Sequence, residues 1–282
     1  MNSTTEVNHE KLMELFGNVF NDVAGSMAIM MSYLGDQTGA YRAMDKLGPA
    51  SSEEIAKESN VDERYLLEWL SSNAGRGYVT YHEETDQFSL SPEQAAVFAR
   101  ETEPTCIQGL VQGVVGQFVK EDVAVEVFKT GRGRPWGEHH ECCFCGTERF
   151  FRPAYAGHLL DEWIPAMEGV EAKLKKGAKV ADIGCGLGTS SMLMAEQYPN
   201  SIIHAFDFHE PSIEEAKKRA EEKGLTNLEF FVSDAAAIPK ESYDLACIFD
   251  AWHDMGDPVG VAKAIKNTLA EDGTFMVVEP MA

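Results

Sequence analysis

The amino-acid sequence predicts an α/β protein, in which a mainly helical first part precedes a doubly wound parallel sheet. Two observations predict this fold class. From residue 178 onward, short apolar segments alternate with amphipathic helical ones, whereas the preceding residues carry mostly helical periodicity. At 180–191, "VADIGCGLGTSS", an apolar run ends in an acid and glycines follow at alternate positions, which is typical of a tight turn from a strand into a helix.

The amino-acid composition limits the partners and the cellular location that we expect for this protein. The 282 residues carry a net charge of −22, which argues against nucleic acid or an acidic membrane surface as a partner. The sequence starts without a basic stretch before an apolar one, and nowhere do about eighteen apolar residues follow one another. The six cysteines are scattered, which suits free thiols in a reducing compartment. We therefore expect a cytoplasmic protein without a membrane span.

Residues 9–31 predict one long helix with a single apolar stripe. Its spacing is helical throughout, at Leu12, Leu15, Phe16, Val19, Val23, Met27, Met30 and Met31. Such a stripe packs either into the core or against a second copy of the chain. We expect a homodimer through these N-terminal helices.

Residues 36–90 predict a winged-helix unit within a first domain at 1–100. A helix near 36–46 is followed by a short helix that Ser51 or Ser52 can cap. A third helix follows, with Tyr65, Leu66, Trp69 and Leu70 expected on its buried side, and two strands around a polar turn then form the wing. A winged helix suggests a DNA-binding regulator as one alternative.

Charge disfavours that alternative. Residues 1–100 contain seven Lys and Arg against sixteen Asp and Glu, a net charge of −9. The expected wing carries Glu83, Glu84 and Asp86 without Lys or Arg, so it would repel phosphates. We interpret the module as a packing or dimerisation domain that does not bind nucleic acid.

Residues 101–177 are expected to form a helical linker and part of an acceptor pocket. An apolar helical stretch at 105–129 carries Gly109, Gly113 and Gly116, which would permit close helix contact. A Gly-, Arg- and Pro-rich link at 130–153 and a further helix at 153–169 follow. Within the link, "HHECCFCG" could bind zinc or be a loop with incidental thiols. No second ligand pair lies elsewhere in the sequence, so we expect no metal.

Strands and helices alternate over 178–282. Strands are predicted at 179–184, 201–207, 228–234, 243–250 and 274–280, with helices at about 189–198, 211–223 and 258–269. Because ligands bind beyond the carboxyl ends of such strands, residues at these ends are the candidates for a site.

Three strands end in acids, at Asp182, Asp207 and Asp234. A carboxylate at 207 can accept both hydroxyls of a ribose, which would serve either a nicotinamide dinucleotide or an adenosyl ligand. The G-x-G-x-G spacing departs from the G-x-G-x-x-G of dinucleotide sites. An acidic ring also suits the sulfonium and ammonium groups of S-adenosylmethionine better than a pyrophosphate, so a dehydrogenase is disfavoured.

The segments "VADIGCGLG", "HAFDFHEPSIEEA", "FFVSDAAAIP" and "SYDLACIFDAWHDM" resemble, in order and spacing, the class I S-adenosylmethionine-dependent methyltransferases. With the preceding module, the chain is similar to caffeate-type small-molecule O-methyltransferases and to bacterial winged-helix methyltransferases. The resemblance implies a Rossmann-like methyltransferase sheet with S-adenosylmethionine as cofactor. The cofactor-binding residues that it implies are Asp182, Gly184, Gly186, Gly188, Asp207, Phe208, Asp234, Ala235 and Asp250.

The resemblance also implies the chemistry. His253 matches the base that accepts a proton from a hydroxyl acceptor, beside Asp254, and Glu279 matches the group that orients it. Alternatively, His253 caps a helix or faces solvent, and Asp254 is a helix cap. Residues expected at the acceptor are Trp136, His139, His140 and Trp252. The runner-up function is a transcriptional regulator or a ligand-binding protein without catalysis.

One departure from the family concerns the sheet. The family has seven strands, whereas the sequence is expected to supply only the first five and to lack the last two, which would leave an edge uncovered. We therefore expect a C-terminally truncated methyltransferase domain.

Overall fold

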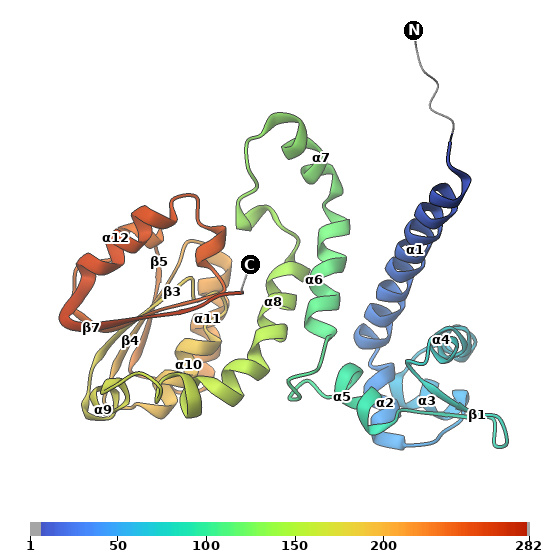
Figure 1. Cartoon of the computed structure of the whole chain (residues 1–282). Coiled ribbons are helices and arrows are strands. Elements are labelled where there is room, and N and C mark those ends of the chain that lie inside the picture. The colour runs from blue at the N-terminus through green and yellow to red at the C-terminus, as the bar shows by residue number, and fades with distance from the viewer. Residues whose placement is uncertain (1–6, 281–282) are drawn as a thin grey trace, which may run out of the picture. The chain divides into compact units, whose positions relative to one another are not determined.

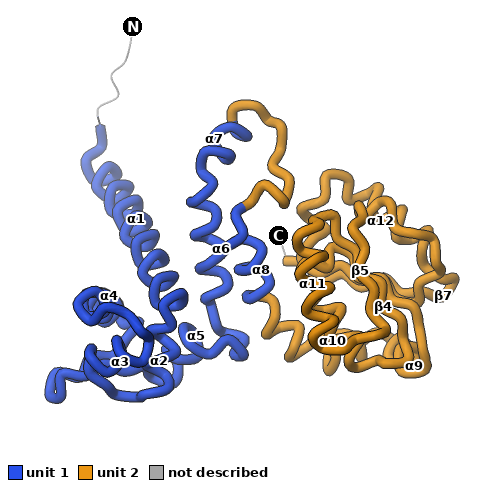
Figure 2. Tube along the Cα trace, turned by 180° about the vertical axis from the view of Figure 1, so that it is seen from behind, with its two compact units in different colours: residues 1–128, 140–150 blue, residues 129–139, 151–282 orange. Residues whose placement is uncertain are grey.

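The structure is a computed structural model that describes residues 7–280 and forms two compact units (Figures 1 and 2). Unit 1 contains the residues up to 128 together with 140–150, and unit 2 contains 129–139 together with those from 151 onward. The predicted ranges 1–100 and 178–282 extend past the described residues by the first six and the last two positions. The segment expected to be separate at 101–177 is instead divided between the two units.

Unit 1 begins with the long helix α1 (His9–Gln37). The remaining elements of its winged-helix part are α2 (Ala40–Leu47), α3 (Ser52–Ser59), α4 (Glu63–Gly75), β1 (Thr80–His82), β2 (Gln87–Ser89) and α5 (Pro92–Phe98). Ser51 caps α3 in a capping box with Glu54, and β1 pairs antiparallel with β2 as the wing. The helices α1 to α4 and the two strands of the wing were predicted, whereas α5 was not. Tyr65 was wrongly placed on the buried side of α4: it is 80% exposed, because the face that packs inward runs through Leu66, Trp69 and Leu70.

The apolar stripe of α1 is largely exposed, so the interpretation that it packs into the core is wrong. The buried residues of α1 are Ala28, Ser32, Gly35 and Asp36, all in its second half. The N-terminal half stands clear of the remainder of unit 1 in Figure 1. Its apolar side chains pack against nothing within the described chain that would bury them, and the expected dimer stays a prediction.

Three further helices complete unit 1: α6 (Gln108–Val119), α7 (Glu121–Thr130) and the first part of α8 (Glu141–Ala154). Gly109 and Gly116 of α6 permit close contact, as predicted: a Cβ at Gly109 would lie 2.4 Å from Phe150 N, and one at Gly116 would lie 2.7 Å from Cys143 Sγ, whereas one at Gly113 would have nothing within 4 Å. The link expected at 130–153 is wrong over its second half, because residues 141–154 form α8. Small residues at 142, 143 and 146 let α8 pack on α6, and this tertiary contact outweighs the loop-like composition.

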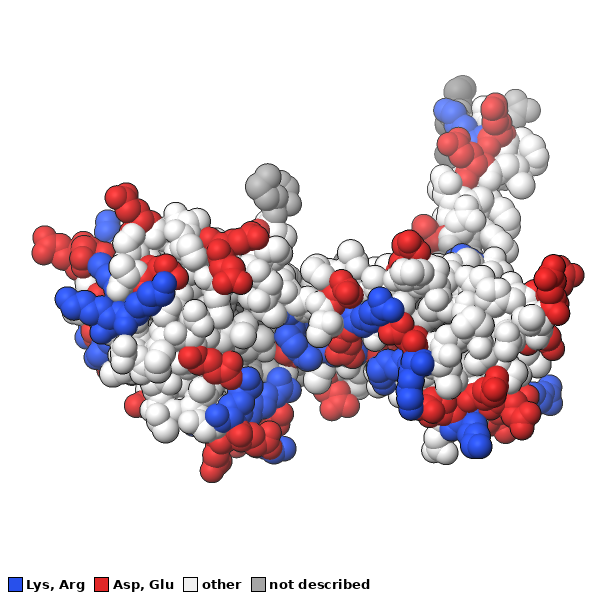
Figure 3. Space-filling model, turned by 90° about the horizontal axis from the view of Figure 1, so that it is seen from below, with Lys and Arg blue, Asp and Glu red and all other residues white. Residues whose placement is uncertain are grey.

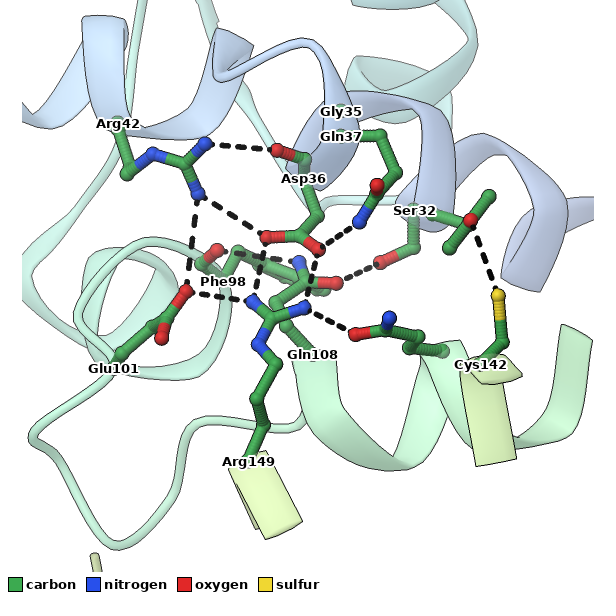
Figure 4. A network of polar contacts seen from close by, with 12 residues as sticks. Ser32, Gly35, Asp36, Gln37, Arg42, Phe98, Glu101, Gln108, Cys142 and Arg149 are labelled. Carbon is green, nitrogen blue, oxygen red and sulfur yellow. Dashed lines mark hydrogen bonds and ion pairs between the residues drawn. The ribbon is translucent and has the colours of Figure 1, made fainter. Parts of the chain in front are cut away.

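A buried polar network ties α8 to α1 (Figure 4). Arg149 donates from Nη1 to Asp36 Oδ2 at 2.8 Å and from Nη2 to Asp36 Oδ1 at 2.9 Å. Arg149 also donates to Glu101 and to Gln112, each at 2.6 Å, and Arg42 Nη1 reaches Asp36 Oδ1 at 3.2 Å. Only 3% of the Asp36 side chain is exposed, so its charge is neutralised inside the protein.

Unit 2 contains a five-stranded parallel sheet in the order β5-β4-β3-β6-β7. The strands are β3 (Lys179–Ile183), β4 (Ile202–Asp207), β5 (Leu228–Val232), β6 (Tyr243–Phe249) and β7 (Leu269–Val278). The helical elements are η1 (Trp136–Glu138), the π-helix η2 (Tyr155–Trp163), α9 (Val170–Lys176), α10 (Thr189–Gln197), α11 (Glu210–Glu222), η3 (Ala235–Ala237), η4 (Trp252–Asp254) and α12 (Pro258–Thr268).

Both faces of this sheet are covered, as a doubly wound fold requires. One core contains Val180, Ile203 and Leu245 of the sheet with residues of η2, α10 and α11. The other contains Ala181, Phe206 and Ala246 with residues of α12. The predicted α/β architecture is therefore confirmed. The described residues contain seven strands, two in the wing and five in the sheet, which are the five strands predicted for it.

Candidate active site

The carboxyl ends of β3, β4, β6 and β7 lie along one edge of the parallel sheet of unit 2. The first sheet strand, β3, lies between β4 and β6. The chain builds β4 and β5 on one side of β3 and then crosses to build β6 and β7 on the other side. At such a switch point the loops diverge and leave room for a ligand beyond the strand ends. The candidate residues predicted from the sequence follow these strands.

The three glycines of the turn after β3 differ in how much space surrounds them. Gly184 and Gly188 have φ of 72° and 78°, and a Cβ at either would lie 2.7 Å from the protein itself, from Ala251 Cβ and Phe230 Cε1 respectively. Gly186, with φ of 53°, has nothing within 4 Å of its Cβ position. Two of the glycines therefore allow the chain to pack, and Gly186 borders open space that a ligand could use.

Asp182, the last acid of β3, is fully buried beneath this turn. Its Oδ2 accepts hydrogen bonds from Ser190 Oγ at 2.7 Å and Ser191 Oγ at 2.5 Å, while no polar partner lies near Oδ1 among the described residues. Burial raises the pKa of Asp182 to about 6. The two serines were not predicted, although their place in the first turn of α10 was a signal for a partner to a buried acid.

The end of β4 presents Asp207 and Phe208. Asp207 Oδ2 accepts from Gly186 N at 2.9 Å and Oδ1 accepts from His209 N at 2.8 Å, which fixes the carboxylate against the glycine turn. The Phe208 ring is 54% exposed, unusual for an apolar side chain beside a strand end. Asp234 lies after β5, where its Oδ1 caps η3 through Ala236 N at 2.7 Å. Ala235 is partly buried at the start of η3.

A His–Glu pair joins the ends of β6 and β7. His253 Nδ1 and Glu279 Oε2 lie 2.5 Å apart, and Glu279 Oε1 accepts from Ala251 N at 3.0 Å and Trp252 N at 2.7 Å. The hydrogen bond that His253 donates to Glu279 raises the pKa of His253 above its ordinary value. Burial alone would raise the pKa of Glu279, but its hydrogen bonds from His253 and the backbone keep it below the ordinary value. Nδ1 therefore donates to Glu279 and Nε2 is left for another group.

Two further acids flank this pair. Asp250 adopts a left-handed conformation with φ of 51°, and burial raises its pKa to about 6. Asp254 Oδ1 lies 3.7 Å from His253 Nε2 and its side chain is 62% exposed. Asp254 is not the cap of α12, a role that Asp257 fills by accepting from Gly260 N at 2.8 Å.

Asp250, His253 and Glu279 each offer one ligand atom, and these atoms lie within 4.8 Å of one another. A metal ion could be held at that spacing. Both oxygens of Glu279 are, however, already engaged by backbone N–H groups and by His253. We therefore interpret this group as a hydrogen-bonded pair that fixes an imidazole.

Comparison with known families covers both units. Residues 174–282 match the family described as "Methyltransferase domain", and residues 25–100 match "Rv2258c-like winged HTH domain". The sheet of unit 2 belongs to a class I methyltransferase domain. The winged helix predicted for the first domain is confirmed by the second match.

Individual proteins agree with these matches. The "Ubiquinone biosynthesis O-methyltransferase" of Actinobacillus pleuropneumoniae serotype 5b is 32% identical over 105 residues, which are 35% of this chain and 44% of that protein. The structure of the "Mitomycin 7-O-methyltransferase MmcR" superposes with a TM-score of 0.70 at 16% identity, over 98% of this chain and 83% of that one. Human N-acetylserotonin methyltransferase in complex with SAM gives 0.65 at 14% identity, over 97% and 80%. At such identities the structures show a shared fold. The chain spans less than half the length of the first curated relatives that it matches.

Of the four residues predicted to contact an acceptor, Trp136, His139 and Trp252 lie in unit 2 and His140 lies in unit 1. In the methyltransferase domain, Trp252 packs its ring against Phe275 and donates from Nε1 to Pro258 O, so the structure gives it a packing role. Trp136 and His139 lie in the segment 129–139 of unit 2, with ring centroids 5.3 Å apart. Burial and Arg134 lower the pKa of His139, and the nearby Asp254 opposes them.

The segment 129–139 also lies close to the end of β4, because a Cβ at Gly137 would lie 3.4 Å from His209. His140 belongs to unit 1 instead, where its Nδ1 accepts from Cys142 N at 3.2 Å. The thiols of "HHECCFCG" diverge as well: Cys142 Sγ faces Tyr33 and Cys143 Sγ faces Gly113 O. Among the residues that the structure describes, this segment forms no cluster of metal ligands.

Proposed function

We propose that this protein transfers a methyl group from S-adenosylmethionine to a hydroxyl group of a small molecule. The observation that carries the proposal is the His253–Glu279 pair at the same strand edge as the glycine turn. Support for oxygen as the acceptor atom comes from the names of similar proteins, which include a ubiquinone biosynthesis O-methyltransferase and a mitomycin 7-O-methyltransferase.

The residues present fit the cofactor. Gly186 leaves open space at the turn, and the buried Oδ1 of Asp182 lacks a hydrogen-bond partner among the described residues. That atom is suited to an ammonium donor, directly or through a water. Asp207 would accept the ribose hydroxyls, and the exposed Phe208 ring would lie against the adenine, with Asp234 and Ala235 near its amino group. Asp250 would add negative charge beside the sulfonium.

The chemistry then follows from the pair at β6 and β7. When bound, S-adenosylmethionine supplies an electrophilic methyl group on a positively charged sulfur. His253 Nε2 would accept the proton of the acceptor hydroxyl while the oxygen forms its bond to the methyl carbon. Glu279 would hold the ring through Nδ1 and stabilise the imidazolium that forms. Asp254 lies near enough to Nε2 to add to that stabilisation. Trp136 and His139 would border the acceptor.

Methyl transfer from labelled S-adenosylmethionine to a panel of phenols and alcohols tests this proposal. Each hydroxyl compound is paired with its own O-methyl ether, in which the hydroxyl is blocked. Label in the free hydroxyl compound and none in its ether is the expected result. Label in amines or thiols alone would show that oxygen is not the acceptor.

Asp207 tests the cofactor site separately. Asp207→Ala should weaken S-adenosylhomocysteine binding by about 1–3 kcal/mol, because buried donors of the ligand lose a charged acceptor. Asp234→Ala is the comparison, and it should cost less because Asp234 is exposed. Calorimetric affinities for the two variants give the measurement, and an unchanged affinity in Asp207→Ala would remove this residue from the site.

We further propose that the chain forms a homodimer through α1. Ten large apolar side chains of α1 are each at least 39% exposed, namely Leu12, Met13, Leu15, Phe16, Val19, Phe20, Val23, Met27, Met30 and Leu34. A contiguous exposed apolar surface of this kind is typical of a protein–protein contact.

Basic and acidic side chains are interspersed on the face drawn in Figure 3, and no role in nucleic-acid binding is proposed for the winged helix.

Replacing Phe16 and Phe20 tests the dimer, because these rings stack on each other at 6.1 Å in the middle of the exposed stripe. Phe16→Asp with Phe20→Asp should convert a dimer into a monomer in light scattering at micromolar concentration. Val259→Asp, at a 61%-exposed apolar residue of α12, is the matched control and should leave the mass unchanged. A wild-type monomer would contradict the proposal.

Among the described residues, no helix is both long enough and apolar enough to cross a membrane. The cytoplasmic location stays a prediction.

A further inference from the structure

Three cysteines near the start of α8 have different surroundings. Cys142 and Cys143 are 7% and 2% exposed, whereas Cys145 is exposed. Cys142 and Cys145 are separated by two residues, the C-x-x-C spacing of dithiol sites, and they lie at the start of a helix. The methyl-transfer chemistry proposed above uses none of them.

Cys142 is part of the contact between α8 and α1. Its Sγ lies 3.6 Å from Tyr33 Oη of α1, at the edge of the polar network in Figure 4. Arg149, two helical turns further along α8, makes the other contact through Asp36. Residues 142 and 149 therefore share the face of α8 that packs on α1, and position 145 lies beside that face one turn after Cys142.

Helical geometry places the two thiols one turn apart, so a local change in the backbone is needed to join them. Side chains three residues apart in a helix have Cβ atoms about 5–6 Å apart, and a disulfide needs about 3.5–4.5 Å. Because Cys142 is the second residue of α8, unwinding the first turn frees its backbone from the helical conformation, and this local change closes the difference. Cys143 is excluded as the partner, because its Sγ points to Gly113 O on α6 at 3.7 Å and a disulfide between neighbouring residues would distort the peptide between them.

We propose that Cys142 and Cys145 form a reversible redox site that takes glutathione disulfide as its oxidant. The exposed Cys145 thiolate attacks one sulfur of glutathione disulfide, forming a mixed disulfide and releasing one glutathione thiolate. Cys142, after losing its proton to solvent, attacks Cys145 Sγ, forms the Cys142–Cys145 bond and releases the second glutathione thiolate. Two cysteines are oxidised and one glutathione disulfide is reduced to two thiols, so the electrons balance. The reaction removes the thiol of Cys142 from Tyr33 and leaves Asp36–Arg149 to hold α8.

Mass spectrometry of the full chain tests this proposal and does not depend on methyltransferase activity. The protein is equilibrated in glutathione buffers of increasing disulfide content, remaining thiols are alkylated, and the peptide that contains both cysteines is mapped. The expected product has Cys142 linked to Cys145, and glutathione in excess reverses it. Cys145→Ser should acquire neither the link nor glutathione in this turn, whereas Cys142→Ser should stop with glutathione on Cys145.

Two further variants sharpen the test. Cys106→Ser should behave as the wild type, because Cys106 is buried elsewhere in unit 1 and burial raises its pKa. Tyr33→Phe should speed ring closure by about 2–5-fold, because it removes the hydroxyl that holds Cys142 Sγ on α1. A wild-type protein that stops at the mixed disulfide, links Cys142 to Cys143, or keeps both thiols reduced at full oxidant would overturn the proposal.

Discussion

His253→Ala should lower turnover of a hydroxyl acceptor by roughly 10²–10⁴-fold, the usual contribution of a positioned acid–base group. The affinity for S-adenosylhomocysteine should hardly change, because Nε2 is directed away from Glu279 and toward the proposed acceptor. Steady-state rates at saturating cofactor give the measurement. His9→Ala, at an exposed histidine at the start of α1, is the matched control and should keep full activity.

The pH profile separates a base from a merely structural histidine. The neutral ring is the active form, so the rate should rise with pH through a pKa that Glu279 holds above the ordinary value. Glu279→Gln removes the carboxylate, so the rise should move to lower pH and the maximal rate should fall less than in His253→Ala. A folded, cofactor-binding His253→Ala enzyme with normal turnover would show that alignment alone drives the reaction.

Arg149→Met should destabilise unit 1 by about 3 kcal/mol, because it leaves Asp36 buried without its bidentate partner. The remaining contact from Arg42 at 3.2 Å keeps the loss at the lower end of the range for broken buried pairs. Arg100→Met is the matched control. Arg100 pairs with Asp45 at 2.8 Å on the surface, and its loss should cost far less, because water screens an exposed ion pair. Urea unfolding of the full chain followed by tryptophan fluorescence gives both values.

The pH dependence of this difference has a defined sign. Burial alone would raise the pKa of Asp36, but the hydrogen bonds and charge of Arg149 outweigh it and hold the pKa below the ordinary value. The stabilisation is therefore present above the ordinary carboxyl pKa and disappears as pH falls through the lowered one. Wild type and Arg149→Met should converge in acid. Equal losses in Arg149→Met and Arg100→Met at neutral pH would contradict the importance of the network.

The sheet of unit 2 was predictable because its signals are local. Each strand is a short apolar run, and each candidate acid lies at or just after the end of a strand, so Asp182, Asp207 and Glu279 could be placed at one edge before the structure was known. The pairing of His253 with Glu279 came from the family resemblance. The structure adds its geometry, which places the two atoms 2.5 Å apart.

What could not be predicted depends on residues distant in the sequence. Asp36 and Arg149 are 113 positions apart, and nothing local marks either as buried. Helix α8 looked like a link because its helical state depends on packing against α6 glycines rather than on its own composition. Likewise, the apolar periodicity of α1 indicated a helix correctly but could not tell a core face from an exposed one.

Titration calorimetry with S-adenosylhomocysteine and with NAD tests the central claim most directly. The turn at Gly186, the buried Asp182 and the fixed Asp207 carboxylate should bind S-adenosylhomocysteine and leave NAD unbound. The affinity for S-adenosylhomocysteine should rise with pH through about 6, as Asp182 ionises and attracts the ammonium group, and Asp182→Asn should abolish this rise. Binding of NAD without uptake of S-adenosylhomocysteine by the folded protein would contradict the account.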